Sequence, residues 1–250
     1  MKIIQVVGRS GSGKTTFIRK LCEVLQEKGR VGTIKHLGHH TFGLTPGKDT
    51  TLFFETGIDA SVGIDDEKTV TTVRSLSVHH ALCSLADMGI DYCIIEGFKQ
   101  NTYSRIVIGD LASDALLKNP TVSDITGRLS EFDDFFTLAS KTCFLQNPGG
   151  NSSCQISFLF TITGPDSPEH DSRVKAVTAS LTQKQLQAPV FYLYPVYCMD
   201  TEQPYLGVII DCRNGIEITV VDIVLSNLKR ECAQAGLSIL TRGSSLPENT

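Results

Sequence analysis

A glycine-rich segment near the N-terminus contains the residues with the clearest chemical role. Residues 8 to 15, Gly-Arg-Ser-Gly-Ser-Gly-Lys-Thr, fit the phosphate-loop pattern G-x-x-x-x-G-K-[ST] at every fixed position. In such a loop the glycines let the backbone curl around a phosphate, the lysine reaches the β- and γ-phosphates, and the hydroxyl ligates Mg²⁺. The residues that we expect to bind a nucleotide here are Gly8, Ser10, Gly11, Ser12, Gly13, Lys14, Thr15 and Thr16.

The segments on either side of this loop have the composition that a phosphate site requires. Residues 3 to 7 form an apolar, β-branched run typical of a buried parallel strand, and apolar residues recur at helical spacing from Phe17 to Leu25. A helix N-terminus presents unpaired N–H groups and a partial positive charge, so it favours an anion. The pattern predicts nucleotide binding; the alternative is a simple turn between a strand and a helix.

A carboxylate ends the apolar run of residues 92 to 95. Glu96 lies where a phosphate-loop protein needs an acidic group to orient Mg²⁺ or a metal-bound water. Aspartate is the usual residue there, and an ordinary strand-end carboxylate is the alternative. We predict that Lys14 and Glu96 are catalytic and that Thr15 and Glu96 hold the metal. Lys99 is expected to contact phosphate, unless it faces water.

Residues 35 to 40, Lys-His-Leu-Gly-His-His, follow a predicted strand at residues 31 to 34. Loops at the carboxyl ends of parallel strands line the ligand crevice, so we expect Lys35 and His36 to contact the nucleotide or a substrate. His36, His39 and His40 also permit a metal site, and a plain surface loop is the third alternative. The sequence does not decide between these roles.

Lys48 and Asp49 precede a predicted helix that ends near Gly57. If this loop lies at the same sheet edge, both side chains can contact the nucleotide or its metal. The alternative is that Asp49 caps the helix, because aspartate is a favoured N-cap residue. Spacing alone leaves the two roles equally supported.

Four ordered motifs resemble a known family. They are residues 8–16, Ile34-Lys35-His36, Gly47-Lys48-Asp49-Thr50 and residues 95–99, Ile-Glu-Gly-Phe-Lys. Residues 1 to 143 resemble the molybdopterin-guanine dinucleotide biosynthesis protein B family, MobB. The resemblance implies a phosphate-loop α/β fold that binds GTP with Mg²⁺, hydrolyses it feebly and forms a homodimer. It also implies assistance to the guanylyltransferase MobA in attaching GMP to molybdopterin, with Lys48, Asp49 and Glu96 in a shared crevice.

The chain is predicted to contain two domains. Residues 146–154 are rich in Pro, Gly, Asn and Ser, which is typical of a linker. Residues 1–145 then form a mostly parallel, phosphate-loop NTPase-like sheet with helices on both faces, closed by a helix over 129–139. Residues 155–250 form a smaller α+β domain, with strands at 155–163, 190–197 and 205–210 and a helix at 220–235 on one face.

Composition excludes several classes of protein. A net charge of −4 argues against an extended nucleic-acid-binding face, and no apolar run approaches the length of a membrane span. The chain enters its first strand directly after Met1, so we expect a cytoplasmic protein. Its eight cysteines contain no C-x-x-C pair and are predicted to be structural thiols.

We therefore predict a GTP-binding accessory protein of molybdenum or tungsten cofactor biosynthesis with weak GTPase activity. A phosphate-loop small-molecule kinase and a nucleotide-switched metallochaperone are the alternatives. The guanine-reading N-K-x-D signature is absent, so the sequence does not decide between GTP and ATP. The ligand of the C-terminal domain is also left open.

Overall fold

The structure is a computed structural model, and the part of the chain that it describes falls into two compact units. The first unit comprises Lys2–Leu85 and Ile90–Asp133, and the second comprises Asp134–Thr250 with Met1 and Ala86–Gly89. The predicted linker at 146–154 and the histidines at 39 and 40 lie outside the described residues. The described residues are 1–38, 43–74, 77–138, 140, 155–164, 168–183, 190–199, 201–211 and 218–241.

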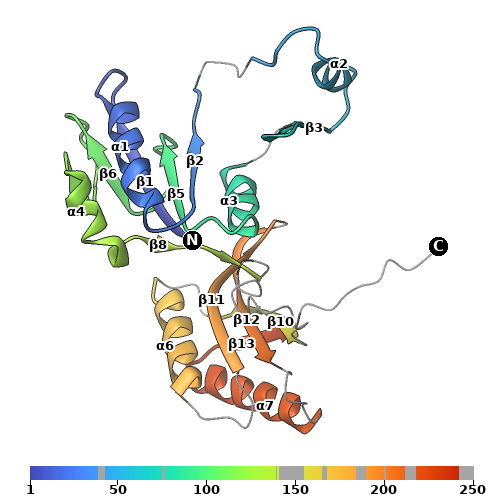
Figure 1. The fold of residues 1–250 in the computed structure, drawn as a ribbon. Helices are drawn as coiled ribbons and strands as arrows, with labels where there is room; N and C mark the ends of the chain where they lie inside the picture. The colour runs from blue at the N-terminus through green and yellow to red at the C-terminus, as the bar shows by residue number, and fades with distance from the viewer. Residues whose placement is uncertain are drawn as a thin grey trace. The chain divides into compact units, whose positions relative to one another are not determined.

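A parallel sheet forms the centre of the first unit (Figure 1). Its strands are β1 (Lys2–Gly8), β2 (Val31–Lys35), β5 (Tyr92–Glu96), β6 (Arg105–Ile108) and β7 (Leu117–Lys118). They lie in the order β2-β5-β1-β6-β7, with all four pairs parallel, and the short β8 (Asp133–Asp134) also pairs with β1. The apolar run of β1 is buried because this strand is central in the sheet and helices cover both faces.

Helices cover both faces of this sheet, as predicted. Ile4 and Val6 face α1 (Lys14–Gln26), which buries Leu21 and Leu25 against them, and α4 (Val122–Thr126) adds to the same core. On the other face, α3 (Val78–Asp87) places a Leu85 methyl so close to Gly32 that an added Cβ would lie 3.2 Å from it. Glycine in this strand therefore makes room for the helix.

A separate arm follows β2 in the chain. It consists of α2 (Asp49–Glu55) packed on an antiparallel hairpin, β3 (Ala60–Ile64) and β4 (Thr69–Val73). The helix predicted to end near Gly57 is confirmed. A two-stranded hairpin with one short helix buries little apolar surface, and large side chains on it stay exposed. The exposed fractions are 57% for Phe53, 53% for Val62, 78% for Ile64 and 49% for Val70.

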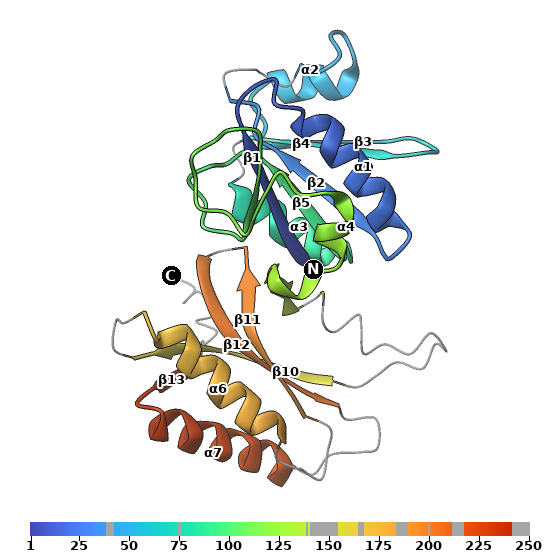
Figure 2. The same ribbon diagram turned by 90° about the vertical axis from the view of Figure 1, so that its left-hand side faces the viewer.

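The second unit is built around an antiparallel sheet (Figure 2). Its elements are β10 (Gln155–Thr163), α6 (His170–Gln183), β11 (Val190–Cys198), β12 (Thr201–Asp211), α7 (Ile218–Gln234) and β13 (Ser238–Thr241), with β9 (Phe136–Thr137) beside β11. The strands lie in the order β13-β10-β12-β11-β9. This βαββαβ order is that of a ferredoxin-like fold. The predicted α+β class is confirmed.

Both helices of the second unit cover one face of its sheet. Val177 from α6 and Val224 and Leu228 from α7 join Phe160 of β10 and Val208 of β12 in one buried cluster. The prediction of a single covering helix was therefore incomplete. None of the helices in the described ranges combines the length and apolarity needed to cross a membrane.

The helix predicted over residues 129 to 139 is wrong. The chain forms a 3-10 turn at Leu129–Glu131 and continues into β8 and β9. The aromatic residues of this segment belong to different environments, because Phe132 joins the core of the first unit whereas Phe135 stacks on Tyr197 at 4.3 Å. The boundary between the units falls between Asp133 and Asp134. One face of a helix could not place Phe132 and Phe135 in these two separate environments.

Burial of Cys93 gives the protein a weakness at alkaline pH. Desolvation raises the pKa of this thiol from 9.0 to about 12. The folded state then retains a proton that the unfolded state releases, so stability is full below pH 9 and falls as the pH rises toward 12. We expect wild type to lose about 1 kcal/mol more than Cys93→Ala between pH 8 and pH 10, measured by urea unfolding. Equal losses in both proteins would contradict this account.

Candidate nucleotide site

The phosphate loop lies where β1 turns into α1. Gly11 and Gly13 have φ values of +75° and +88°, which favour glycine, and Gly13 is the N-cap of α1. No side chain caps this helix, and its first backbone bond runs from the Phe17 amide to the Gly13 carbonyl. The N–H groups of the first turn therefore have no intrahelical acceptor, which is the arrangement that binds anions.

Close packing at Gly8 holds the base of the loop. A Cβ on Gly8 would lie 2.3 Å from the Ile108 carbonyl oxygen and 2.7 Å from Ser12 Oγ, so a larger residue does not fit. Ser12 Oγ is itself buried and has no hydrogen-bond partner among the described residues. A buried hydroxyl normally has a partner. Ser12 therefore offers an unused donor inside the loop.

Lys14 extends back over the loop. Its Nζ donates a 2.6 Å hydrogen bond to the carbonyl oxygen of Arg9, and the residue is half-buried. By contrast Ser10, Gly11, Thr15 and Thr16 are exposed. The ammonium of Lys14 is thus held across the loop residues that the motif predicts to bind phosphate.

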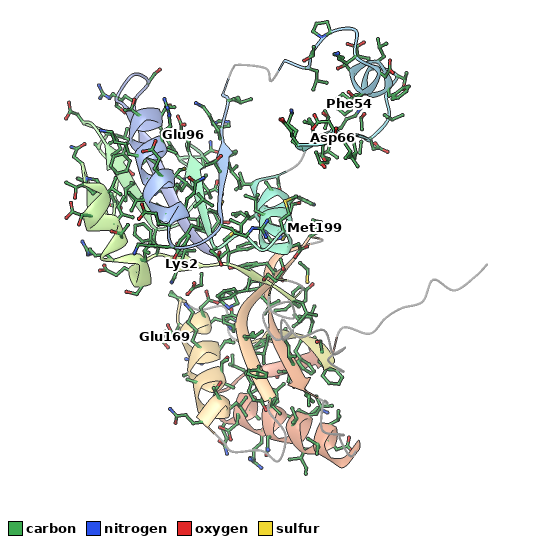
Figure 3. All side chains as sticks on the ribbon, in the orientation of Figure 1. Lys2, Phe54, Asp66, Glu96, Glu169 and Met199 are labelled. Carbon is green, nitrogen blue, oxygen red and sulfur yellow. The ribbon has the colours of Figure 1, made fainter. Side chains whose placement is uncertain are left out.

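Strand register brings Glu96 to the same edge as the phosphate loop. Glu96 is opposite Val6 of β1 on one side and Lys35 of β2 on the other. Lys35 Nζ lies 3.3 Å from Glu96 Oε2, and the Glu96 side chain is only 15% exposed. Figure 3 shows Glu96 at the carboxyl end of the sheet. Because Lys35 is half exposed, the ion pair stabilises the fold by at most about 1 kcal/mol.

His36 packs on the turn that follows Glu96. Its backbone N–H donates to the Glu96 carbonyl oxygen at 2.9 Å, and its ring lies 4.6 Å from the Phe98 ring. Lys99, which follows in this turn, is exposed. The described residues contain no group of three potential metal-ligating side chains. Because His39 and His40 lie outside them, the metal alternative stays a prediction.

Lys48 and Asp49 belong to the arm. Asp49 is the first residue of α2, and Lys48 holds the N-cap position without a side-chain hydrogen bond, so Asp49 does not cap the helix. Lys48 lines a cavity of about 680 Å³ on the arm, together with Asp65 and Lys68. Within the described ranges no hydrogen bond or ion pair joins Lys48 or Asp49 to the phosphate loop. Their contact with nucleotide stays a prediction.

Two polar residues near this edge were not predicted from the sequence to have a role in the site. Gln5 is fully buried in β1, and its side chain bonds the backbone of the turn after Glu96. Asn119 adopts φ +47° and accepts a 2.6 Å bond from the Gly109 N–H, beside the phosphate loop. A glutamine inside an apolar run was a visible signal. The sequence contains no comparable signal for Asn119, because its role depends on the contact with Gly109, which only the folded chain brings about.

Known proteins match this part of the chain. Residues 3–125 match the family model of molybdopterin guanine dinucleotide synthesis protein B, MobB. Residues 3–125 are MobB-like. This confirms the resemblance inferred from the four motifs, over most of the predicted range. The match includes β1, the phosphate loop, the arm and Glu96.

Two curated relatives are similar to part of this chain. A probable molybdopterin-guanine dinucleotide biosynthesis adapter protein of Bacillus subtilis is 36% identical over 110 residues, which cover 42% of this chain and 64% of the relative. A putative molybdopterin-guanine dinucleotide biosynthesis adapter protein of Methanocaldococcus jannaschii is 34% identical over 100 residues. These residues cover 40% of this chain and 42% of the relative. The chain therefore spans less than two thirds of either relative.

A solved structure also matches. The crystal structure of Bacillus subtilis MobB is 26% identical, with a TM-score of 0.42, and the match covers 53% of this chain and 99% of that chain. The strand order and the parallel register of β2, β5, β1 and β6 establish the α/β fold of this region.

Proposed function

We propose that the protein binds GTP with Mg²⁺ and acts as an accessory protein in the biosynthesis of a molybdopterin-guanine dinucleotide cofactor. The observation that carries the proposal is the uncapped N-terminus of α1, with its phosphate loop, at the same sheet edge as Glu96. Backbone N–H groups, the Ser12 hydroxyl and Lys14 supply donors for phosphate oxygens. Phosphoryl transfer requires mainly such positioning and charge neutralisation.

The donor set also fits magnesium. Mg²⁺ prefers oxygen ligands and usually takes one or two from the protein, with the rest from phosphates and water. Thr15 offers a hydroxyl on the first turn of α1, and Glu96 offers a carboxylate whose Oε2 lies 3.3 Å from Lys35 Nζ. We infer that Mg²⁺ replaces Lys35 as the partner of Glu96. Bound there, the ion would neutralise charge on the phosphates and support slow hydrolysis.

The biosynthetic role rests on the names of the relatives. The two relatives are named probable and putative molybdopterin-guanine dinucleotide biosynthesis adapter proteins. We propose that this chain assists a MobA-like guanylyltransferase and that the ferredoxin-like unit contributes a surface for that partner or for molybdopterin. The predicted cytoplasmic location is part of the same proposal.

The arm supports a homodimer. Phe53, Val62, Ile64 and Val70 expose large apolar side chains on a small hairpin and its helix. Patches of this kind mark protein interfaces. We propose that two copies cover these side chains in a dimer, and sedimentation at increasing protein concentration tests this.

Calorimetric titration with GTP and with ATP, each with Mg²⁺, tests the proposed function. We expect saturable binding of GTP, at least tenfold tighter than ATP, that weakens when EDTA removes the metal. A preference for ATP with rapid, substrate-dependent turnover would replace this function with that of a kinase. Binding of neither nucleotide would refute the proposal.

A further inference from the structure

Gln5 is an anomaly in the central strand of the first unit. Its neighbours Ile4 and Val6 are apolar, and all three residues have no exposed surface. Burying an amide is unfavourable unless it is hydrogen-bonded, so apolar residues usually fill such positions. Moreover, Gln5 Oε1 is buried without a partner in the described part of the chain. Stability alone therefore gives little reason for a glutamine here.

The amide of Gln5 is directed at the turn after Glu96. Its Nε2 donates to the carbonyl oxygens of Gly97 and Phe98, at 2.9 and 2.7 Å. Both hydrogens of the amide nitrogen are thus used on consecutive residues. Among the described residues, the Gly97 carbonyl has no other hydrogen-bond donor.

A second side chain, from the neighbouring strand β6, holds the next part of the same turn. Arg105 is opposite Gln5 in the register of β1 and β6. Its guanidinium donates to the carbonyl oxygens of Lys99 and Asn101. Gln5 and Arg105 together bond four carbonyls between residues 97 and 101. We call this pair the turn clamp.

The turn needs such support because its backbone is strained. Phe98 has φ +49°, in the left-handed region that residues with a Cβ rarely adopt, and Gly97 has φ +93°. An added Cβ on Gly97 would lie 3.0 Å from His36 Cβ. Strained backbone persists only where surrounding contacts hold it. The turn clamp supplies such contacts directly behind Glu96.

We propose that Gln5 is a positioning residue: by holding the turn at residues 97–101, it fixes the direction of the Glu96 carboxylate toward the nucleotide-bound metal and that of Lys99 toward the phosphates. The proposal rests on the proposed function. Glu96 lies on the α1 face of the sheet and Gln5 on the other, so Gln5 acts on Glu96 only through the backbone. The sheet thus has its metal ligand, at the end of β5, on one face and the support of that ligand, in β1, on the other.

Two measurements on Gln5→Met test the proposal, because methionine has similar length and no donor. The rate of backbone amide hydrogen exchange at residues 97–101 measures how firmly the turn is held, and no ligand is needed. We expect this rate to increase about tenfold in Gln5→Met. The Mg²⁺ concentration that half-saturates nucleotide binding depends on whether the Glu96 carboxylate is placed to bind the metal. We expect it to rise about tenfold, with nucleotide binding in EDTA unchanged.

Ile3→Val is the matched control, since it removes one buried methylene from the same face of β1. It should change neither measurement. Unchanged exchange in Gln5→Met would overturn the turn clamp, and unchanged Mg²⁺ dependence would overturn the positioning of Glu96. Equal weakening with and without Mg²⁺ would show a merely structural role. If wild type binds no nucleotide, the proposed function fails, and hydrogen exchange still decides the role of Gln5 in the turn.

Discussion

Lys14→Ala is expected to weaken GTP binding at least about 100-fold while leaving the fold intact. The ammonium now bonds the Arg9 carbonyl at 2.6 Å and would exchange this neutral acceptor for phosphate oxygens. Charge-assisted hydrogen bonds contribute about 1.5–3 kcal/mol each, so the loss of two gives a change of this size. Calorimetry in the presence of Mg²⁺ measures the affinity, and thermal unfolding checks the fold.

Lys20→Ala provides the control for net charge. Lys20 is an exposed lysine on the same helix, away from the loop. Its removal should change GTP affinity less than about twofold, because exposed charges are screened by solvent and salt. Equal effects of the two substitutions would mean that Lys14 attracts the nucleotide only through its charge, and the proposed phosphate contact would fail.

Phe160→Ala is expected to destabilise the second unit by about 3–5 kcal/mol, because it empties the centre of a core. Phe160 is 1% exposed and packs within the cluster that unites β10, β12 and both helices. Urea unfolding should show a transition of the second unit at lower concentration. GTP affinity should be unchanged, since the phosphate loop belongs to the first unit.

Phe191→Ala is the matched control in the same sheet. Phe191 is 36% exposed and adjoins Tyr192, which points into the core, so it lies on the opposite face. A loss below about 1.5 kcal/mol is expected there, because less apolar surface leaves water. If Phe160→Ala abolished GTP binding, the two units would unfold together and the division of the chain would need revision.

Much of the first unit could be predicted because its local patterns agree with one another. The run before Gly8, the glycines and the helical spacing after Thr15 each favour the same strand-loop-helix structure, and the structure confirms it. Glu96 could be placed at the sheet edge for the same reason, since a buried strand must end there. Its pairing with Lys35 required the register of β2 and β5, which spacing does not reveal.

The failures have physical causes. Three phenylalanines near residue 135 have a spacing that favoured the predicted helix over 129–139. In the structure Phe132 and Phe135 pack in different environments. Helix α6 was missed although its buried residues Val174, Val177 and Leu181 recur at i, i+3 and i+7. Threonines and serines, which have low helix propensity, lie around these three residues. The turn clamp was missed because its partners come together only when β1, β5 and β6 align.

The in-register pairing of β1 with β5 has an evolutionary consequence. Side chains alternate between the faces of a strand, so a one-residue insertion or deletion within residues 92–96 would turn the carboxylate away from α1 and into the α3 side. It would also move the turn away from Gln5. Substitutions within β5 can therefore be tolerated one at a time, whereas its length cannot change. The number of residues in β5 is therefore as much a requirement of the proposed metal site as the side chain of Glu96.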